Sequence, residues 1–330
     1  MKFKLVKFDG DIHNQLLEHK FSQLMTENFD IEIFDSQTTY NKSSTVFCIS
    51  LYQFNINENK DTIKNLIDAG YKIIIENLHE GGFGLESHLI PRGNNVLTIT
   101  CGTKGQSKVH VPMFFWYNMY PAYVDSAHRL NYTTLNREYT FDKKFLMLMN
   151  NIRPFRDKIY SKFNDILNES YHSYVERGIK ISEDNVNLPI PEWMRYINVE
   201  WYNHTQFSVV VETSMNSNGV FLTEKTMKPL AIKHPFITLG DTGALALLKS
   251  SGFETFENIF DESYDVITDQ SNKIDAVYTQ VKNYNQTGYS KLTEDKLEHN
   301  YNLFHNDAEV NRRFKQEIIM PILEFADATT

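Results

Sequence analysis

The sequence predicts an α/β protein with open parallel sheets. Short apolar runs, rich in β-branched residues, alternate along the chain with longer segments whose apolar residues recur at helical spacing. Strands that alternate with helices favour a parallel sheet covered by helices on both faces. The alternation restarts near residue 145, so we expect two domains of this type.

The first series of alternating strands and helices predicts a domain over residues 1–135. Its expected strands are 2–8, 31–34, 44–51, 71–75 and 96–100, and its expected helices are 14–29 and 61–69. Gly70 closes the second of these helices. A densely aromatic segment, 112–120, follows the last strand, and a polar stretch, 132–144, forms the crossing to the next domain.

The second series predicts a domain over residues 136–305 and a terminal helical segment over 306–330. Its expected strands are 145–149, 207–211 and 235–239, and its expected helices are one that begins at Arg156, then 224–233, 244–250, 273–284 and 292–304. We interpret 168–191 as an irregular polar connection. Two prolines should distort helices, Pro229 near the middle of 224–233 and Pro321 in the terminal segment.

Length, composition and charge narrow the class of protein. A chain of 330 residues with 41% hydrophobic and 13% aromatic residues can bury two ordinary cores. No apolar run approaches the length of a membrane span, and the first residues lack the core of a signal peptide, so we expect a cytoplasmic protein. Cys48 and Cys101 form no metal motif and are expected to be buried. The net charge of −9 gives no general attraction to nucleic acid.

Two groups of residues that follow predicted strands could bind an anion. Arg153 and Arg156 follow strand 145–149 at the start of a helix, where they could form a fork for a diphosphate. Thr223 is a good N-cap, which places Glu224 and Lys225 in the first turn of the next helix beside free backbone N–H groups. The alternative is that all of these are solvated charges at ordinary helix starts. Both patterns should meet at the carboxyl edge of one parallel sheet.

The segment VFLTEKTMKPLAIKHPFITLG resembles the nucleotide-binding signature of the GT-B glycosyltransferases related to the α1,3-fucosyltransferases, over about fifty residues. In that family the glutamate binds the nucleotide ribose and the lysine binds the diphosphate, which implies these roles for Glu224 and Lys225. An arginine after the first strand of the second domain also contacts the diphosphate, and Arg153 matches it better than Arg156. The family's small residues after the helix are replaced here by Ile232, Lys233 and His234.

The resemblance implies two Rossmann-like domains facing a central cleft, with the last helix crossing back to the first domain. The second domain would hold a nucleotide-sugar donor, with Glu224 and Lys225 on the surface of the cleft. The first would hold a hydroxyl acceptor. Glu76, His79 and Glu80 follow strand 71–75, where a carboxylate could deprotonate that hydroxyl. The alternative is a polar turn with its charges in water.

Two further groups of residues have competing interpretations. The aromatic residues Trp116, Tyr117, Tyr120 and Tyr123 could stack on a sugar, although packing is the commoner use of so many rings. The acidic residues Asp261, Glu262 and Asp265 lack the spacing of a calcium loop, and we interpret them as a turn and a helix start. The run FETFENIF before them recurs in glycosyltransferase-like chains that share the T-E-K segment.

The sequence therefore predicts a glycosyltransferase that moves a sugar from a nucleotide-sugar to a hydroxyl group. No D-x-D or similar carboxylate pair follows a strand, so we expect no metal and no cofactor other than the donor substrate. A narrower alternative is a DNA glycosyltransferase acting on a hydroxylated base, against which the acidic charge balance speaks. A non-catalytic nucleotide- or glycan-binding module is the alternative from another class, and a protein–protein scaffold would leave the phosphate-type residues unexplained.

Overall fold

The computed structural model describes residues 2–7, 21–50, 56–78, 94–101, 109–120, 141–181, 197–215 and 219–328. The chain forms two compact units. Unit 1 consists of Met1–Phe114 together with Asp307–Thr330, and unit 2 is the continuous segment Phe115–Asn306. No helix in the described ranges is both long and apolar enough to cross a membrane.

Unit 1 is built on a six-stranded sheet in the order β2-β1-β3-β4-β5-β6, in which every neighbouring pair is parallel. Its strands are β1 (Phe3–Lys7), β2 (Phe29–Ile33), β3 (Thr45–Ser50), β4 (Lys72–Asn77), β5 (Val96–Thr100) and β6 (Val109–His110). This order is that of a doubly wound sheet, whose ligands bind beyond the carboxyl ends of the strands. Cys48 and Cys101 are buried, as predicted.

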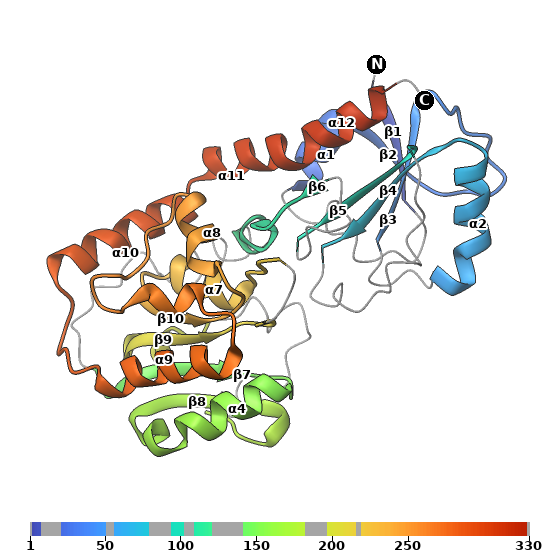
Figure 1. The fold of residues 1–330 in the computed structure, drawn as a ribbon. Helices are drawn as coiled ribbons and strands as arrows, with labels where there is room; N and C mark the ends of the chain where they lie inside the picture. The colour runs from blue at the N-terminus through green and yellow to red at the C-terminus, as the bar shows by residue number, and fades with distance from the viewer. Residues whose placement is uncertain are drawn as a thin grey trace. The chain divides into compact units, whose positions relative to one another are not determined.

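Helices cover both faces of this sheet (Figure 1). They are α1 (Phe21–Asn28), α2 (Ile56–Asp68), α11 (Asp307–Phe314) and α12 (Met320–Asp327). A π-helical stretch, Lys315–Ile319, joins α11 to α12, and Pro321 lies in the first turn of α12. The ammonium of Lys72, at the start of β4, donates hydrogen bonds to the carbonyls of Ala326 at 2.6 Å and Ala328 at 2.5 Å. The end of α12 is thereby attached to β4.

Unit 2 is built on a four-stranded parallel sheet in the order β10-β9-β7-β8. Its strands are β7 (Lys143–Met149), β8 (Ser170–Tyr174), β9 (Thr205–Val211) and β10 (Phe236–Leu239). Its helices are α4 (Pro154–Phe163), α6 (Val199–Asn203), α7 (Glu224–Ala231), α8 (Ala244–Ser250), α9 (Gln270–Asn283) and α10 (Lys291–Phe304). Right-handed connections place α4 and α7 on opposite faces. The helix α9 packs beside α4, and α10 packs beside α7 (Figure 1).

The prediction for 168–191 was wrong in part, because residues 170–174 form strand β8 at the edge of the sheet. The sequence of this strand, SYHSY, has no apolar run, and its three central residues are only partly buried. An edge strand that is half exposed needs few apolar side chains, so its polar composition concealed it.

The aromatic segment contributes to packing, as its composition favoured. Trp116, Tyr117 and Tyr120 lie in a helical stretch and are buried. The indole of Trp116 packs against the ring of Phe253 at 4.9 Å between ring centres, and its N–H donates to the carbonyl of Phe304 at 3.1 Å. These rings belong to the core of unit 2. Tyr123 lies outside the described residues.

Candidate functional site

The candidate site lies at the carboxyl edge of the unit 2 sheet, where β7 and β9 end as parallel neighbours. The buried guanidinium of Arg156 joins the two loops that follow these strands. It donates to the carbonyl of Asn151 at 3.1 Å and to the carbonyl of Glu212 at 3.1 Å. The structure thus brings the loop after β7 next to the end of β9. In this position Arg156 holds backbone groups in place.

Arg153 lies in the same loop, at the residue before α4. Its side chain is only partly buried. Its Nε is shielded from solvent and has no hydrogen-bond partner among the described residues. A guanidinium carries five donors and is always charged, so an anion arriving at this edge would meet an available donor.

Glu212 is a fully buried carboxylate that the sequence analysis did not single out. It follows β9 and accepts hydrogen bonds from the backbone N–H of Thr223 at 3.1 Å and from its hydroxyl at 2.6 Å. It also accepts one from the hydroxyl of Thr226 at 2.5 Å. A carboxylate directly after an apolar run was the signal available in the sequence. Glu212 attaches the first turn of α7 to the end of β9.

Space for the Glu212 side chain depends on Gly240, directly after β10. A Cβ atom at Gly240 would lie 3.2 Å from Cγ of Glu212 and 3.3 Å from its Cβ. These contacts are tighter than ordinary van der Waals packing. Glycine at position 240 therefore leaves room for the carboxylate that positions α7.

Thr223 caps α7 as predicted, because its hydroxyl accepts a hydrogen bond from the backbone N–H of Lys225 at 3.4 Å. The Lys225 ammonium folds back over this cap. It donates to the hydroxyls of Thr213 and Thr223, each at 3.2 Å, and to the Glu224 carboxylate at 2.5 Å. Three of the predicted residues and Thr213 therefore form one cluster.

The expectation that Glu224 and Lys225 lie on a surface was wrong for Glu224, which is buried, whereas Lys225 is partly exposed. The side chain of Glu224 is 2% exposed and that of Lys225 is 17% exposed. The reason is the anchor at Glu212, which draws the first turn of α7 down onto the sheet. The two charges are held as a largely desolvated pair, in which each contact is stronger than it would be in water.

Lys228 is a second lysine of this cluster that sequence reasoning missed. It lies one turn further along α7 and is partly buried. Burial lowers the pKa of Lys228 to about 8, the Glu224 carboxylate acts in the opposite direction, and the Lys225 ammonium lowers it further. Its spacing of three residues from Lys225 and four from Glu224 was the signal in the sequence.

The residues Ile232, Lys233 and His234 form the turn between α7 and β10. Lys233 has a positive φ of 56°. The buried His234 ring bonds the Ser208 hydroxyl at 2.9 Å and the Thr205 carbonyl at 3.0 Å, both on β9. Pro229 lies inside α7, which ends at Ala231, two residues earlier than predicted. The hydrogen bonds of His234 therefore attach this turn to strand β9.

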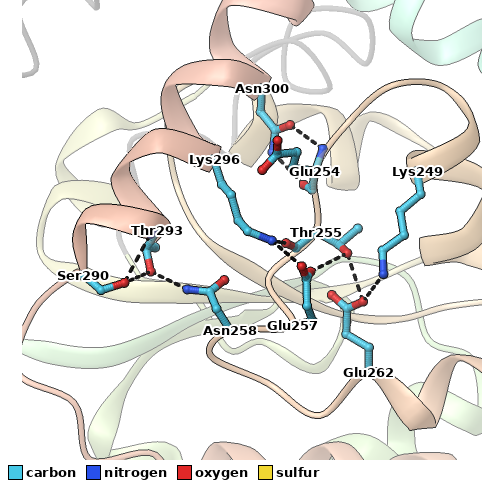
Figure 2. A network of polar contacts seen from close by, with 10 residues as sticks. All are labelled: Lys249, Glu254, Thr255, Glu257, Asn258, Glu262, Ser290, Thr293, Lys296 and Asn300. Atoms are coloured by element: carbon cyan, nitrogen blue, oxygen red, sulfur yellow. Dashed lines mark hydrogen bonds and ion pairs between the residues drawn. The ribbon is translucent and has the colours of Figure 1, made fainter.

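The run that begins at Phe253 is joined to α10 by a network of polar contacts (Figure 2), and α10 packs beside α7. Lys296 of α10 donates to the carbonyl of Thr255 at 2.7 Å and to the carboxylate of Glu257 at 2.6 Å. The side-chain amide of Asn300 and the backbone of Glu254 exchange two hydrogen bonds of 2.8 Å. Although burial alone would raise the pKa of Glu257, the hydrogen bond from Lys296 helps to hold it below its ordinary value.

The acidic residues after this run act in turns and at helix starts, as interpreted. Asp261 accepts from the backbone N–H of Ser263 at 2.9 Å, and Glu262 pairs with Lys249 at 2.7 Å. The carboxylate of Asp265 accepts from the backbone N–H groups of Leu245 and Ala246, each at 3.2 Å, at the start of α8. Within the described ranges, no three His, Cys, Asp or Glu side chains gather as a possible metal site.

In unit 1, Glu76 belongs to β4 itself and does not follow it. Its backbone lies between Ser50 of β3 and Ile99 of β5, and its side chain is fully buried. The strand runs two residues further than predicted, which takes Glu76 into the sheet. His79 and Glu80 lie outside the described residues.

Comparisons with known proteins were made for the whole chain. No family model matches the sequence, and no curated protein matches it. Among solved structures, the crystal structure of an α1,3-fucosyltransferase with GDP-fucose is similar, with a TM-score of 0.46 and 9% sequence identity. The match covers 93% of this chain and 91% of the other. A likeness of this size assigns neither a family nor an activity.

Proposed function

We propose that this chain is a glycosyltransferase that moves a sugar from a nucleotide-sugar to a hydroxyl acceptor without a divalent metal. The observation that carries the proposal is the cluster at the start of α7. There a lysine and a glutamate are held together at a helix N-terminus, beyond the carboxyl end of a parallel strand. A helix N-terminus with an adjacent lysine favours phosphate, and such strand ends are where open α/β sheets bind ligands.

Each residue of the cluster has a role in the proposed reaction. The bond between the anomeric carbon and the diphosphate oxygen breaks, and its electron pair leaves with the nucleoside diphosphate. Lys225 and Arg153 stabilise the charge that grows there, while Glu224 accepts hydrogen bonds from the ribose hydroxyls. The acceptor oxygen forms the new bond and gives its proton to a base, for which His79 and Glu80 are the sequence-based candidates.

The test compares the variants Lys225→Ala and Glu224→Gln in steady-state kinetics, after a donor has been found by thermal-shift screening of nucleotide-sugars. Losing one electrostatic stabiliser of a leaving group lowers turnover by about a hundred- to a thousandfold. Glu224 binds a ribose that changes little in the reaction, so Glu224→Gln should mainly raise the donor KM, by about ten- to a hundredfold.

Lys249→Ala is the matched control, because this lysine belongs to α8 and pairs with Glu262. The Glu224 change is made to glutamine, since a smaller residue would leave a void beside Lys225. Wild-type turnover in Lys225→Ala would remove the main support for the proposal. Donor binding with neither transfer nor hydrolysis in the wild type would instead indicate a binding module.

A further inference from the structure

Asp241 is a buried carboxylate that has no role in the proposed reaction. It lies two residues beyond the end of β10 and is 2% exposed. Its Oδ1 accepts a hydrogen bond of 3.0 Å from the hydroxyl of Ser214, which lies in the segment that follows β9. Because β9 and β10 are parallel neighbours, the two residues meet at the same carboxyl edge as the candidate site. The contact therefore joins the segments that follow these two strands.

The charge of Asp241 is compensated from α9. A carboxylate removed from water is unfavourable unless a partner offsets its charge. The ammonium of Lys273 donates to the carbonyl of Gly240, the residue before Asp241, at 3.3 Å. Burial lowers the pKa of Lys273, and the carboxylates of Asp265 and Asp241 act in the opposite direction. A carboxylate accepts stronger hydrogen bonds than a neutral group does, so Asp241 is suited to hold Ser214 in a fixed position.

The segment that Asp241 fixes also holds Lys225. Thr213 precedes Ser214 in the chain, and its buried side chain accepts a hydrogen bond from the Lys225 ammonium at 3.2 Å. Thr213 lies between two residues that are both attached elsewhere, Glu212 to α7 and Ser214 to the end of β10. The position of the hydroxyl that receives Lys225 therefore depends on both attachments.

We propose that Asp241 is a positioning residue, which acts through Ser214 and Thr213 to hold the Lys225 ammonium in place for the diphosphate of the donor. The proposal rests on the proposed function, in which Lys225 stabilises the leaving diphosphate, and it adds the contact that fixes this lysine. Lysine has a flexible four-carbon side chain, so an ammonium that is held in advance loses less conformational entropy when it binds an anion. A weaker hold on Thr213 should therefore lower the affinity of Lys225 for phosphate groups.

The test is a double-mutant cycle, measured by calorimetric titration of the full chain with inorganic pyrophosphate. Ser214→Ala removes the hydroxyl that Asp241 binds, and it should weaken pyrophosphate binding by about three- to tenfold, the worth of one hydrogen bond. In a Lys225→Met background the same change should weaken binding by less than about twofold, because its effect passes through Lys225. A general role in stability would give the same loss in both backgrounds.

Variants of Asp241 and of an unrelated serine complete the test. Asp241→Ala should reproduce the loss seen in Ser214→Ala, whereas Asp241→Asn, which keeps an acceptor oxygen, should bind pyrophosphate within about twofold of the wild type. Ser250→Ala is the matched control, because the Ser250 hydroxyl donates to the Leu247 carbonyl within α8. This control should bind pyrophosphate as the wild type does. Should Asp241→Ala fold poorly, the cycle with Ser214→Ala decides the matter.

Turnover separates this proposal from the proposed function. Equal losses in the two backgrounds, in a protein that turns over a nucleotide-sugar, would overturn the role of Asp241 and leave the glycosyltransferase proposal intact. A loss that depends on Lys225, in a protein that turns over no nucleotide-sugar, would support the positioning of Lys225 and contradict the transferase. A wild type that binds no pyrophosphate would overturn the role of Asp241, because Lys225 would then hold no anion.

Discussion

Two parts of unit 2 hold lysines that are buried or partly buried, and they treat the charge differently. In the loop shown in Figure 2, Lys296 donates both to a carbonyl and to Glu257, whose carboxylate reaches the surface. On α7, Lys225 in the first turn pairs with Glu224, whereas the partly buried Lys228 in the last turn has no hydrogen-bond acceptor among the described residues. The first arrangement is complete in itself and serves the fold.

The effect of a lysine on stability therefore differs in sign between the two places. A satisfied buried lysine contributes to stability, because its removal leaves a carbonyl and a carboxylate without their donor. A shielded lysine with no acceptor lowers stability, because the folded chain holds it in an unfavourable place. Substitutions at the two places should therefore change stability with opposite signs.

The largest expected effect is at Glu212, the anchor beneath the second arrangement. Glu212→Ala removes the acceptor of four hydrogen bonds, from the backbone N–H groups of Thr213 and Thr223 and the hydroxyls of Thr223 and Thr226. We expect a loss of about 3–5 kcal/mol in the free energy of unfolding, measured by urea denaturation, because buried donors are left unsatisfied. Glu212→Gln keeps one carbonyl oxygen and should lose less. A small loss in Glu212→Ala would show that α7 does not depend on this carboxylate.

The second prediction concerns Lys296, in the network shown in Figure 2. Lys296→Met should lower the free energy of unfolding by about 1–3 kcal/mol, because the Thr255 carbonyl and Glu257 lose their donor. Lys291→Met on the same helix is the matched control, since this lysine is 81% exposed and pairs only with Asp295, one turn away. The control should change stability by less than about 0.5 kcal/mol. Equal effects of the two changes would contradict a structural role for Lys296.

The smallest effect, with the opposite sign, is at Lys228. Its pKa of about 8 in the folded chain lies below its ordinary value of 10.5, so from about pH 8 to about pH 10.5 the unfolded chain binds more protons. The stability of the wild type should rise with pH across this window. Lys228→Met lacks the titrating group and should be more stable by about 1–3 kcal/mol near pH 7, with the difference vanishing above about pH 10.5.

This pH profile isolates Lys228 from its charged surroundings. Glu224 and Lys225 act on it from its own helix, and α10 presents Glu298, which pairs with Lys233, and His305, which bonds the Ala231 carbonyl. Carboxylates and histidines do not titrate in the window, burial raises the pKa of Tyr301 on α10, and Lys233→Met serves as the lysine control. A lower stability of Lys228→Met at every pH would mean that this lysine has an internal partner and belongs with Lys296.

Much of the fold could be predicted from the sequence because local patterns specify it. The strand at 96–100 and the helix at 244–250 were predicted with the bounds that the structure shows, since an apolar run marks the strand, and apolar helical spacing followed by Gly252 marks the helix. Strand β8 could not be found, because an edge strand needs little apolar surface and its sequence, SYHSY, alternates polar groups with rings. Its pairing partner, β7, lies more than twenty residues earlier in the chain.

In the candidate site, only contacts between residues close together in the sequence could be predicted. The cap at Thr223 and the pair formed by Glu224 and Lys225 depend on neighbouring residues, and their spacing revealed them. The part played by Glu212 depends on residues eleven and fourteen positions later folding back over it. The guanidinium of Arg156 binds backbone carbonyls, which every residue carries, so no sequence pattern could reveal that contact.

The division of unit 1 between the two ends of the chain has a consequence for biosynthesis. A ribosome completes unit 2 once Asn306 has emerged, while α11 and α12, which complete unit 1, are still to be made. Until then, the β4 strand lacks the carbonyls of Ala326 and Ala328 that its Lys72 binds, and the sheet lacks two of its covering helices. Domains generally fold as units during synthesis, and incomplete ones expose apolar surface. The unit that begins first is therefore the last to mature, and during that interval it is the part of the nascent chain most in need of a chaperone.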